Sequence, residues 1–123
     1  MRKVFSFLNI KRKYSVGEVV IDIDYTHRMP DYARDHKYYD KFLPCIVPFL
    51  HKNQIVIEVG ANVGYTLISM ANINNSLEYI CYEADDSCFT DLNKNIETLK
   101  KINKNLKVTA IKQFIGLDIN NVS

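Results

Sequence analysis

Residues 55–64 read IVIEVGANVG, and this stretch decides the fold. The first five residues are apolar or β-branched apart from Glu58, and such a run is typical of a strand covered on both faces. Gly60 ends the strand, and residues 63–73 have helical spacing with Asn62 as the expected N-cap. We therefore predict a buried strand that turns sharply into a helix.

The same alternation continues toward the C-terminus. Residues 77–82 form a second expected strand, which Glu83 closes. A second helix follows, with Asp85 or Asp86 as its cap, and residues 107–113 form a third strand. Strand, helix, strand, helix, strand is the βαβαβ unit of a parallel sheet with right-handed crossovers. The predicted fold class is therefore α/β.

The N-terminal third is less regular. Residues 20–25 alternate in the manner of a half-buried strand, with Ile21 on its inner face. Residues 27–35, HRMPDYARD, are polar and contain a proline, which favours a loop. Residues 38–50 have an apolar helical stripe but contain two prolines, so we expect a broken or kinked helix there.

Composition narrows the class of protein. The chain has 123 residues, of which 47% are hydrophobic and 24% charged, as in one globular domain and not in a disordered chain. The formal net charge of +2 is too small to indicate nucleic-acid binding. A cluster of lysines and arginines in the first 14 residues is interpreted as a solvated basic terminus.

Cysteine usage and hydropathy bear on the compartment. Cys45, Cys81 and Cys88 form no CxxC pair, which argues against a disulfide scaffold or a cysteine metal site, and no metal is predicted. No apolar run approaches the roughly 18 residues that span a bilayer, so no transmembrane segment is expected. We interpret the chain as cytoplasmic.

The predicted sheet places a ligand site after its first strand. In doubly wound sheets, ligands lie beyond the carboxyl ends of the strands. Gly60 permits close backbone approach, and Gly64 lets the helix start lie close against the strand. Glu83 ends the second strand 23 positions after Gly60, close to the spacing of about 20 at which a carboxylate accepts hydrogen bonds from ribose hydroxyls.

The residues of the turn favour S-adenosylmethionine over a dinucleotide as the ligand. Dinucleotide-binding turns have a second glycine two positions after the first, where this chain has Asn62. A ligand without phosphate needs no such clearance, and one with an ammonium group is favoured by Glu58. S-adenosylmethionine has both properties. A nicotinamide-dependent oxidoreductase is less favoured, and GxxxG alone is also compatible with a pair of helix-packing glycines.

These residues resemble a known family. Residues 57–66, IEVGANVGYT, are similar to the first motif of FkbM-family S-adenosylmethionine-dependent methyltransferases, D-V-G-A-N-x-G, and residues 81–85, CYEAD, resemble their second motif, F-E-P-x. The lead-in Tyr39–Asp40 also has the look of the family, and the resemblance covers about residues 38–116. It implies cofactor-binding roles for seven residues: Glu58, Gly60, Ala61, Asn62, Gly64, Glu83 and Ala84. Glu58 replaces the usual Asp, and Ala84 the usual Pro.

The resemblance also implies an activity and a partner. Members of the family methylate hydroxyl oxygens of small molecules and sugars, so we expect O-methylation of a small molecule or glycan. The expected organisation is an irregular segment over residues 1–37, with a strand at 20–25, and over 38–123 the first half of a methyltransferase domain.

The family domain continues past its third strand, whereas this chain ends at Ser123. We therefore expect a Rossmann-like class I methyltransferase fold truncated after the third parallel strand, and no catalytic residue can be assigned. His36 and His51 are expected to be surface residues. The alternative is a catalytically inactive nucleotide-binding or interaction module.

The truncation predicts an open sheet edge at residues 55–59, which invites self-association unless the strand at 20–25 folds back over it. Partial disorder is expected near residues 117–123.

Overall fold

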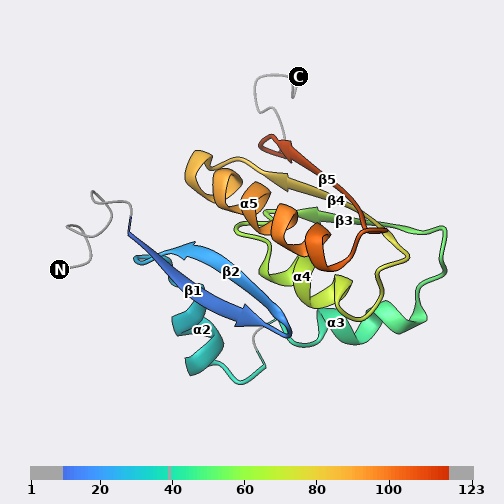
Figure 1. The fold of residues 1–123 in the computed structure, drawn as a ribbon, viewed down its shortest axis with the longest axis horizontal. Coiled ribbons are helices and arrows are strands. Elements are labelled where there is room, and N and C mark those ends of the chain that lie inside the picture. Colours follow the sequence, from blue (N-terminus) through green and yellow to red (C-terminus); the bar gives the residue numbers. More distant parts are fainter. Residues whose placement is uncertain (1–9, 39, 117–123) are drawn as a thin grey trace, which may run out of the picture.

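The computed structural model describes residues 10–38 and 40–116 (Figure 1). Its main sheet has three parallel strands in the order β3-β4-β5. These are β3 (Ile55–Val59), β4 (Glu78–Glu83) and β5 (Lys107–Lys112). All three were predicted from the sequence to within about one residue at each end, and the α/β class is confirmed.

Two helices connect the strands. α4 (Tyr65–Ala71) links β3 to β4, and α5 (Asp86–Ile102) links β4 to β5. The predicted cap of α5 is confirmed, because the Asp85 side chain accepts a hydrogen bond from the Cys88 N–H at 2.8 Å. The predicted cap of α4 is wrong. Gly64, in a left-handed conformation, occupies that position, and Asn62 lies two residues before this cap.

The N-terminal part is more ordered than expected. β1 (Lys11–Val16) and β2 (Val19–Asp24) form an antiparallel hairpin that is a separate sheet. The expectation of one strand in an irregular segment is thus wrong for these residues, although β2 matches the predicted strand. The expectation that this strand could cover the edge of β3 is also wrong, because its partner is β1.

Prolines mark the starts of the three short helical elements that follow. α2 (Met29–Asp35) has Pro30 in its first turn, where a missing backbone N–H costs no helical hydrogen bond, so the predicted loop at 27–35 is wrong. α3 (Leu43–Ile46) and the 3-10 helix η1 (Val47–Phe49) each have a proline as their second residue, as α2 does. The predicted break in the helix over residues 38–50 is therefore confirmed.

The basic residues at the start of β1 are bound within the fold. Lys11 Nζ lies 2.7 Å from Oδ2 of Asp91 on α5, a carboxylate whose side chain is 2% exposed. The Arg12 guanidinium donates to the carbonyl oxygen of His27. Lys11 and Arg12 therefore belong to the fold and not to a solvated terminus. The basic residues at positions 2 and 3, Tyr39 and the expected disorder near residues 117–123 all lie outside the described residues.

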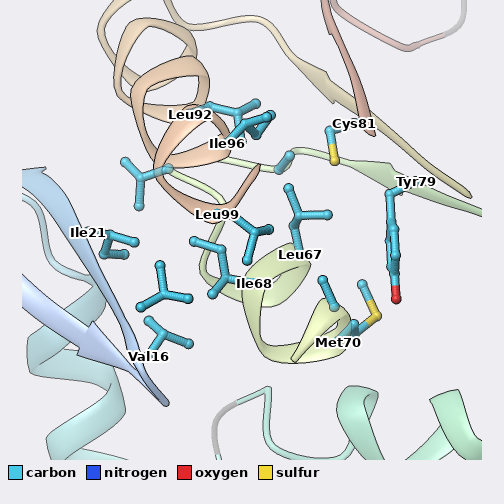
Figure 2. Packing of buried hydrophobic residues seen from close by; sticks show 14 of the residues in the cluster. Val16, Ile21, Leu67, Ile68, Met70, Tyr79, Cys81, Leu92, Ile96 and Leu99 are labelled. Carbon is cyan, nitrogen blue, oxygen red and sulfur yellow. The ribbon is translucent and has the colours of Figure 1, made fainter. Parts of the chain in front are cut away.

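One hydrophobic core joins the hairpin to the sheet. Figure 2 shows Val16 and Ile21 of the hairpin, Leu67 and Ile68 of α4 and Leu92 of α5 packed together. α5 lies between the hairpin and the parallel sheet (Figure 1). Cys81 on β4 is fully buried in the same core, as a small apolar side chain.

The other face of the sheet is open. Both crossovers run the same way across the strands, so α4 and α5 cover a single face. On the opposite face Ile55, Ile57 and Val59 are 52%, 62% and 59% exposed. The prediction that β3 is covered on both faces is therefore wrong for the described part of the chain, in which β3 pairs with β4 alone.

Across residues 10–38 and 40–116, no helix combines the length and the apolar character needed to cross a bilayer.

Candidate functional site

The turn between β3 and α4 is built from left-handed residues. Gly60, Asn62 and Gly64 have φ angles of +77°, +54° and +90°. The backbone N–H groups of Gly60 and Ala61 both donate to the carbonyl oxygen of Tyr82, each at 2.9 Å. The turn is therefore fixed to the carboxyl end of β4, where ligands of parallel sheets bind.

The two glycines of the turn have different surroundings. A Cβ built on Gly60 meets no protein atom within 4 Å, so the space beside it is open. A Cβ on Gly64 would lie 3.0 Å from Cδ1 of Leu92 on α5. Gly60 is thus placed to face a ligand, whereas Gly64 allows the turn to pack against α5. The sequence had predicted for Gly64 a close approach to the strand.

Glu83 holds the turn with both carboxylate oxygens. Oε2 accepts from the Asn62 N–H at 2.7 Å, and Oε1 accepts from the Asp85 N–H at 2.8 Å. Each carboxylate oxygen can accept a further hydrogen bond, so both remain able to bind hydroxyl groups. The sequence predicted the position of Glu83 at the end of β4 but gave no sign of these two contacts.

Two hollows meet at Gly60. The first, of about 300 Å³, lies at the ends of β3, β4 and β5. It is lined by Val59, Gly60, Tyr82, Glu83, Ala84, Gln113, Phe114 and Ile115. The second, of about 420 Å³, lies on the α4 side of the turn. Its polar and charged lining residues are Thr26, His27, Arg28, Tyr32, Asp40, Glu58, Asn62, Tyr65 and Thr66.

The predicted cofactor residues are divided between these hollows. Glu83 and Ala84 line the first, and Glu58, Ala61 and Asn62 line the second. Gly60 lines both, and Gly64 lies beneath the turn against α5. The structure thus places six of the seven residues on two hollows that share Gly60.

Glu58 has an unusual electrostatic environment. Burial, together with the nearby charge of Asp40, raises the pKa of Glu58 to about 7, although hydrogen bonds from Cys81 and Thr66 act in the opposite direction. Cys81 Sγ donates to Glu58 Oε2 at 3.8 Å. Burial and the adjacent Glu58 in turn raise the pKa of the Cys81 thiol. A cationic ligand group in this hollow would relieve the repulsion between Glu58 and Asp40.

His27 is a site residue that the sequence analysis missed. It lies between β2 and α2, and its Nε2 is 2.6 Å from Oδ1 of Asn62. His36 and His51, the two histidines that the sequence analysis did consider, are exposed as predicted. No local spacing could have found His27, because its partner lies 35 residues along the chain.

Within the described residues, no group of three or more His, Cys, Asp or Glu side chains is arranged to hold a metal ion.

The fold is similar to that of several solved structures. The structure of M. jannaschii TYW2 in complex with AdoMet superposes with a TM-score of 0.63 and 19% identity, over 83% of this chain and 42% of that one. P. horikoshii TYW2 in complex with MeSAdo gives a TM-score of 0.60 and 17% identity, over 88% of this chain and 39% of that one. The chain therefore has the Rossmann-like fold of these proteins and spans about two fifths of their length. No protein-family model matches the sequence, and neither does any curated protein.

Proposed function

We propose that the crevice around Gly60 binds S-adenosylmethionine and that the chain is part of an S-adenosylmethionine-dependent methyltransferase. The observation that carries this proposal is the division of the site at Gly60. An adenosine group fits the hollow beside Glu83, and an amino-acid group fits the hollow beside Glu58. Two solved structures of the same fold contain AdoMet and MeSAdo, which supports the assignment.

The residues of each hollow match one end of this ligand. Both carboxylate oxygens of Glu83 can accept hydrogen bonds from the ribose hydroxyls. The open space beside Gly60 admits the middle of the ligand close to the backbone. Glu58 and Asp40 attract the ammonium group at the other end, and a bound ammonium group favours the ionised form of Glu58.

The bound cofactor would supply a methyl group already activated on a sulfonium centre. The chain's contribution is then to hold the donor in one orientation for in-line attack by an acceptor. The similarity of the turn to the FkbM motif supports an oxygen acceptor on a small molecule or glycan. We assign no residue of the chain as the base.

Calorimetric titration with S-adenosylhomocysteine tests the proposal. Glu83→Ala removes the acceptors for two hydroxyls, and we expect affinity to fall by roughly tenfold or more. Glu83→Gln keeps one acceptor oxygen and should lose less. Glu97→Ala is the matched control, because Glu97 is an exposed residue of α5 whose one ion pair within the described residues is with Lys100, at 3.7 Å.

Thermal melts of the same variants separate lost binding from lost folding, since Glu83 also holds the turn. A folded Glu83→Ala protein with unchanged affinity would contradict the role assigned to Glu83. A wild-type protein that binds no S-adenosylhomocysteine would contradict the proposed function.

A further inference from the structure

The ring of His27 has both nitrogens in use. Nδ1 accepts a hydrogen bond from the Met29 N–H at 3.1 Å, at the start of α2. A neutral imidazole carries a single proton, so this proton must be on Nε2. Nε2 is therefore a donor, which excludes His27 in this arrangement as a base that removes a proton through Nε2.

The donor on His27 decides how the Asn62 side chain is oriented. Nε2–H needs an acceptor, and the only acceptor of a carboxamide is its oxygen, which lies 2.6 Å away as Oδ1. The amide NH₂ group of Asn62 consequently points away from His27. No hydrogen-bond partner for that group is found among residues 10–38 and 40–116, and both residues line the 420 Å³ hollow.

We propose that His27 is a positioning residue, which fixes the Asn62 carboxamide so that its NH₂ group donates to the carboxylate of the cofactor's amino-acid end. The inference rests on the proposed function and assigns a partner to that end of the ligand.

The charges of the hollow explain why an amide is suited to this role. The side chains of Asp40 and Glu58 attract the ammonium group of an amino acid but repel its carboxylate. The carboxylate needs a donor, and a neutral NH₂ group provides one without competing for the two acids. Arg28, the cation on the same hollow, lies over the ring of Tyr32, with its guanidinium carbon 5.2 Å from the centroid.

Loss of the His27 donor would remove this preference. The Asn62 amide could then rotate and present Oδ1 to the ligand carboxylate, where two acceptors face each other without a proton between them.

Two conservative variants separate the two hydrogen bonds of His27. Glutamine places its NH₂ group near the position of Nε2 and can still donate to Asn62. Asparagine is shorter and can replace only the Nδ1 contact with the Met29 N–H. We expect His27→Gln to bind S-adenosylhomocysteine within about threefold of wild type, and His27→Asn to bind roughly tenfold more weakly. His51→Asn, in an exposed histidine outside both hollows, is the control.

A second probe locates the effect on the ligand. Methylthioadenosine has the adenosine group but lacks the amino-acid end, so His27→Asn should bind it as well as wild type does. The proposal is overturned if the Gln and Asn variants bind S-adenosylhomocysteine equally well, or if the Asn variant loses both ligands to the same extent. If the wild-type protein binds neither nucleoside, the proposed function fails as well, and this outcome is distinct from the other two.

Nitrogen-15 NMR of the ligand-free protein measures independently which ring nitrogen of His27 carries the proton. The proposal requires the proton on Nε2, and a neutral ring protonated on Nδ1 would overturn it.

Discussion

The side chain of Asn95 on α5 binds the backbone of Asp22 on β2 through both of that residue's peptide groups. Oδ1 accepts from the Asp22 N–H at 2.9 Å, and Nδ2 donates to the Asp22 carbonyl at 3.0 Å. Nδ2 also donates to the carbonyl of Val63 at 2.9 Å. One amide, 1% exposed, therefore connects the hairpin, α5 and the turn that follows β3.

Replacing Asn95 should destabilise the whole fold. Asn95→Ala leaves three backbone groups without their partners, and we expect the free energy of unfolding to fall by about 2–4 kcal/mol. Chemical denaturation measures this loss. Asn93→Ala is the control on the same helix, because the exposed side chain of Asn93 bonds, within the described part of the chain, only to the Phe89 carbonyl one turn earlier. Equal stability of the two variants would contradict the role given to Asn95.

The raised pKa of Glu58 predicts a pH-dependent stability. In the unfolded chain the carboxyl has its ordinary pKa of 4.5, whereas burial raises this pKa to about 7 in the fold. Its contribution to stability is therefore fully present below about pH 4.5 and is lost as the pH rises through 7. Glu58→Gln should be more stable than wild type at pH 8, by about 2–3 kcal/mol, and equally stable at pH 4.

Urea melts across this range measure the difference between the two proteins. A difference that does not change between pH 4 and pH 8 would show that Glu58 ionises normally in the fold. A bound ammonium group should also favour the ionised form of Glu58, so S-adenosylhomocysteine should bind more tightly at pH 8 than at pH 6.

The two glycines of the turn should respond differently to the same substitution. Alanine at either site is strained by positive φ, at a cost of about 1 kcal/mol. At Gly64 the added Cβ also meets Leu92 at 3.0 Å, so Gly64→Ala should show the larger fall in melting temperature. At Gly60 the Cβ enters the open ligand space, so Gly60→Ala should lose more affinity for S-adenosylhomocysteine.

Gly60→Val extends this test with a larger side chain, and we expect a folded protein without measurable binding. Retained binding in that variant would mean that the turn does not hold the ligand.

The open side of β3 predicts self-association. Ile55, Ile57 and Val59 form an exposed apolar row on a strand that has one partner in the described structure, and such strands pair with other chains. Light scattering during size-exclusion chromatography should show dimers or larger species, and Ile57→Lys should reduce them. Val20→Lys, at an exposed valine of the hairpin, is the control. A monodisperse wild-type monomer would contradict this prediction.

The elements that the sequence predicted well are those with a strong local pattern. The apolar stripe of α5 and the apolar residues of β4 are buried in the core, where Tyr79, Cys81, Leu92 and Leu99 lie. β3 and β5 were found from short runs rich in β-branched residues, although none of their residues is fully buried in the described structure. β1 was missed because its alternation includes Lys11 and Arg12, whose partners are distant in the sequence. Asp91 lies 80 residues from Lys11, and only the folded chain brings the two together.

The candidate site divides in the same way. The positions of Gly60 and Glu83 follow from where strands end, which hydropathy and glycine reveal. The position of His27 in the lining of the second hollow depends on how the hairpin packs on α5, and no local sequence pattern indicates that packing. The wrong cap at Asn62 has a related cause, because that residue adopts a left-handed conformation and donates its N–H to Glu83.

Docking of the hairpin on α5 has a consequence for the order of events during translation. β1 and β2 are adjacent in sequence and can pair as soon as both have left the ribosome. Their apolar side, which includes Ile21 and Ile23, has to wait for α5, since Asn95 is synthesised 73 residues after Asp22. Until then the nascent hairpin exposes an apolar surface of the kind that chaperones bind. The ligand crevice, which needs His27 in place, is completed only when the second half of the described chain has emerged.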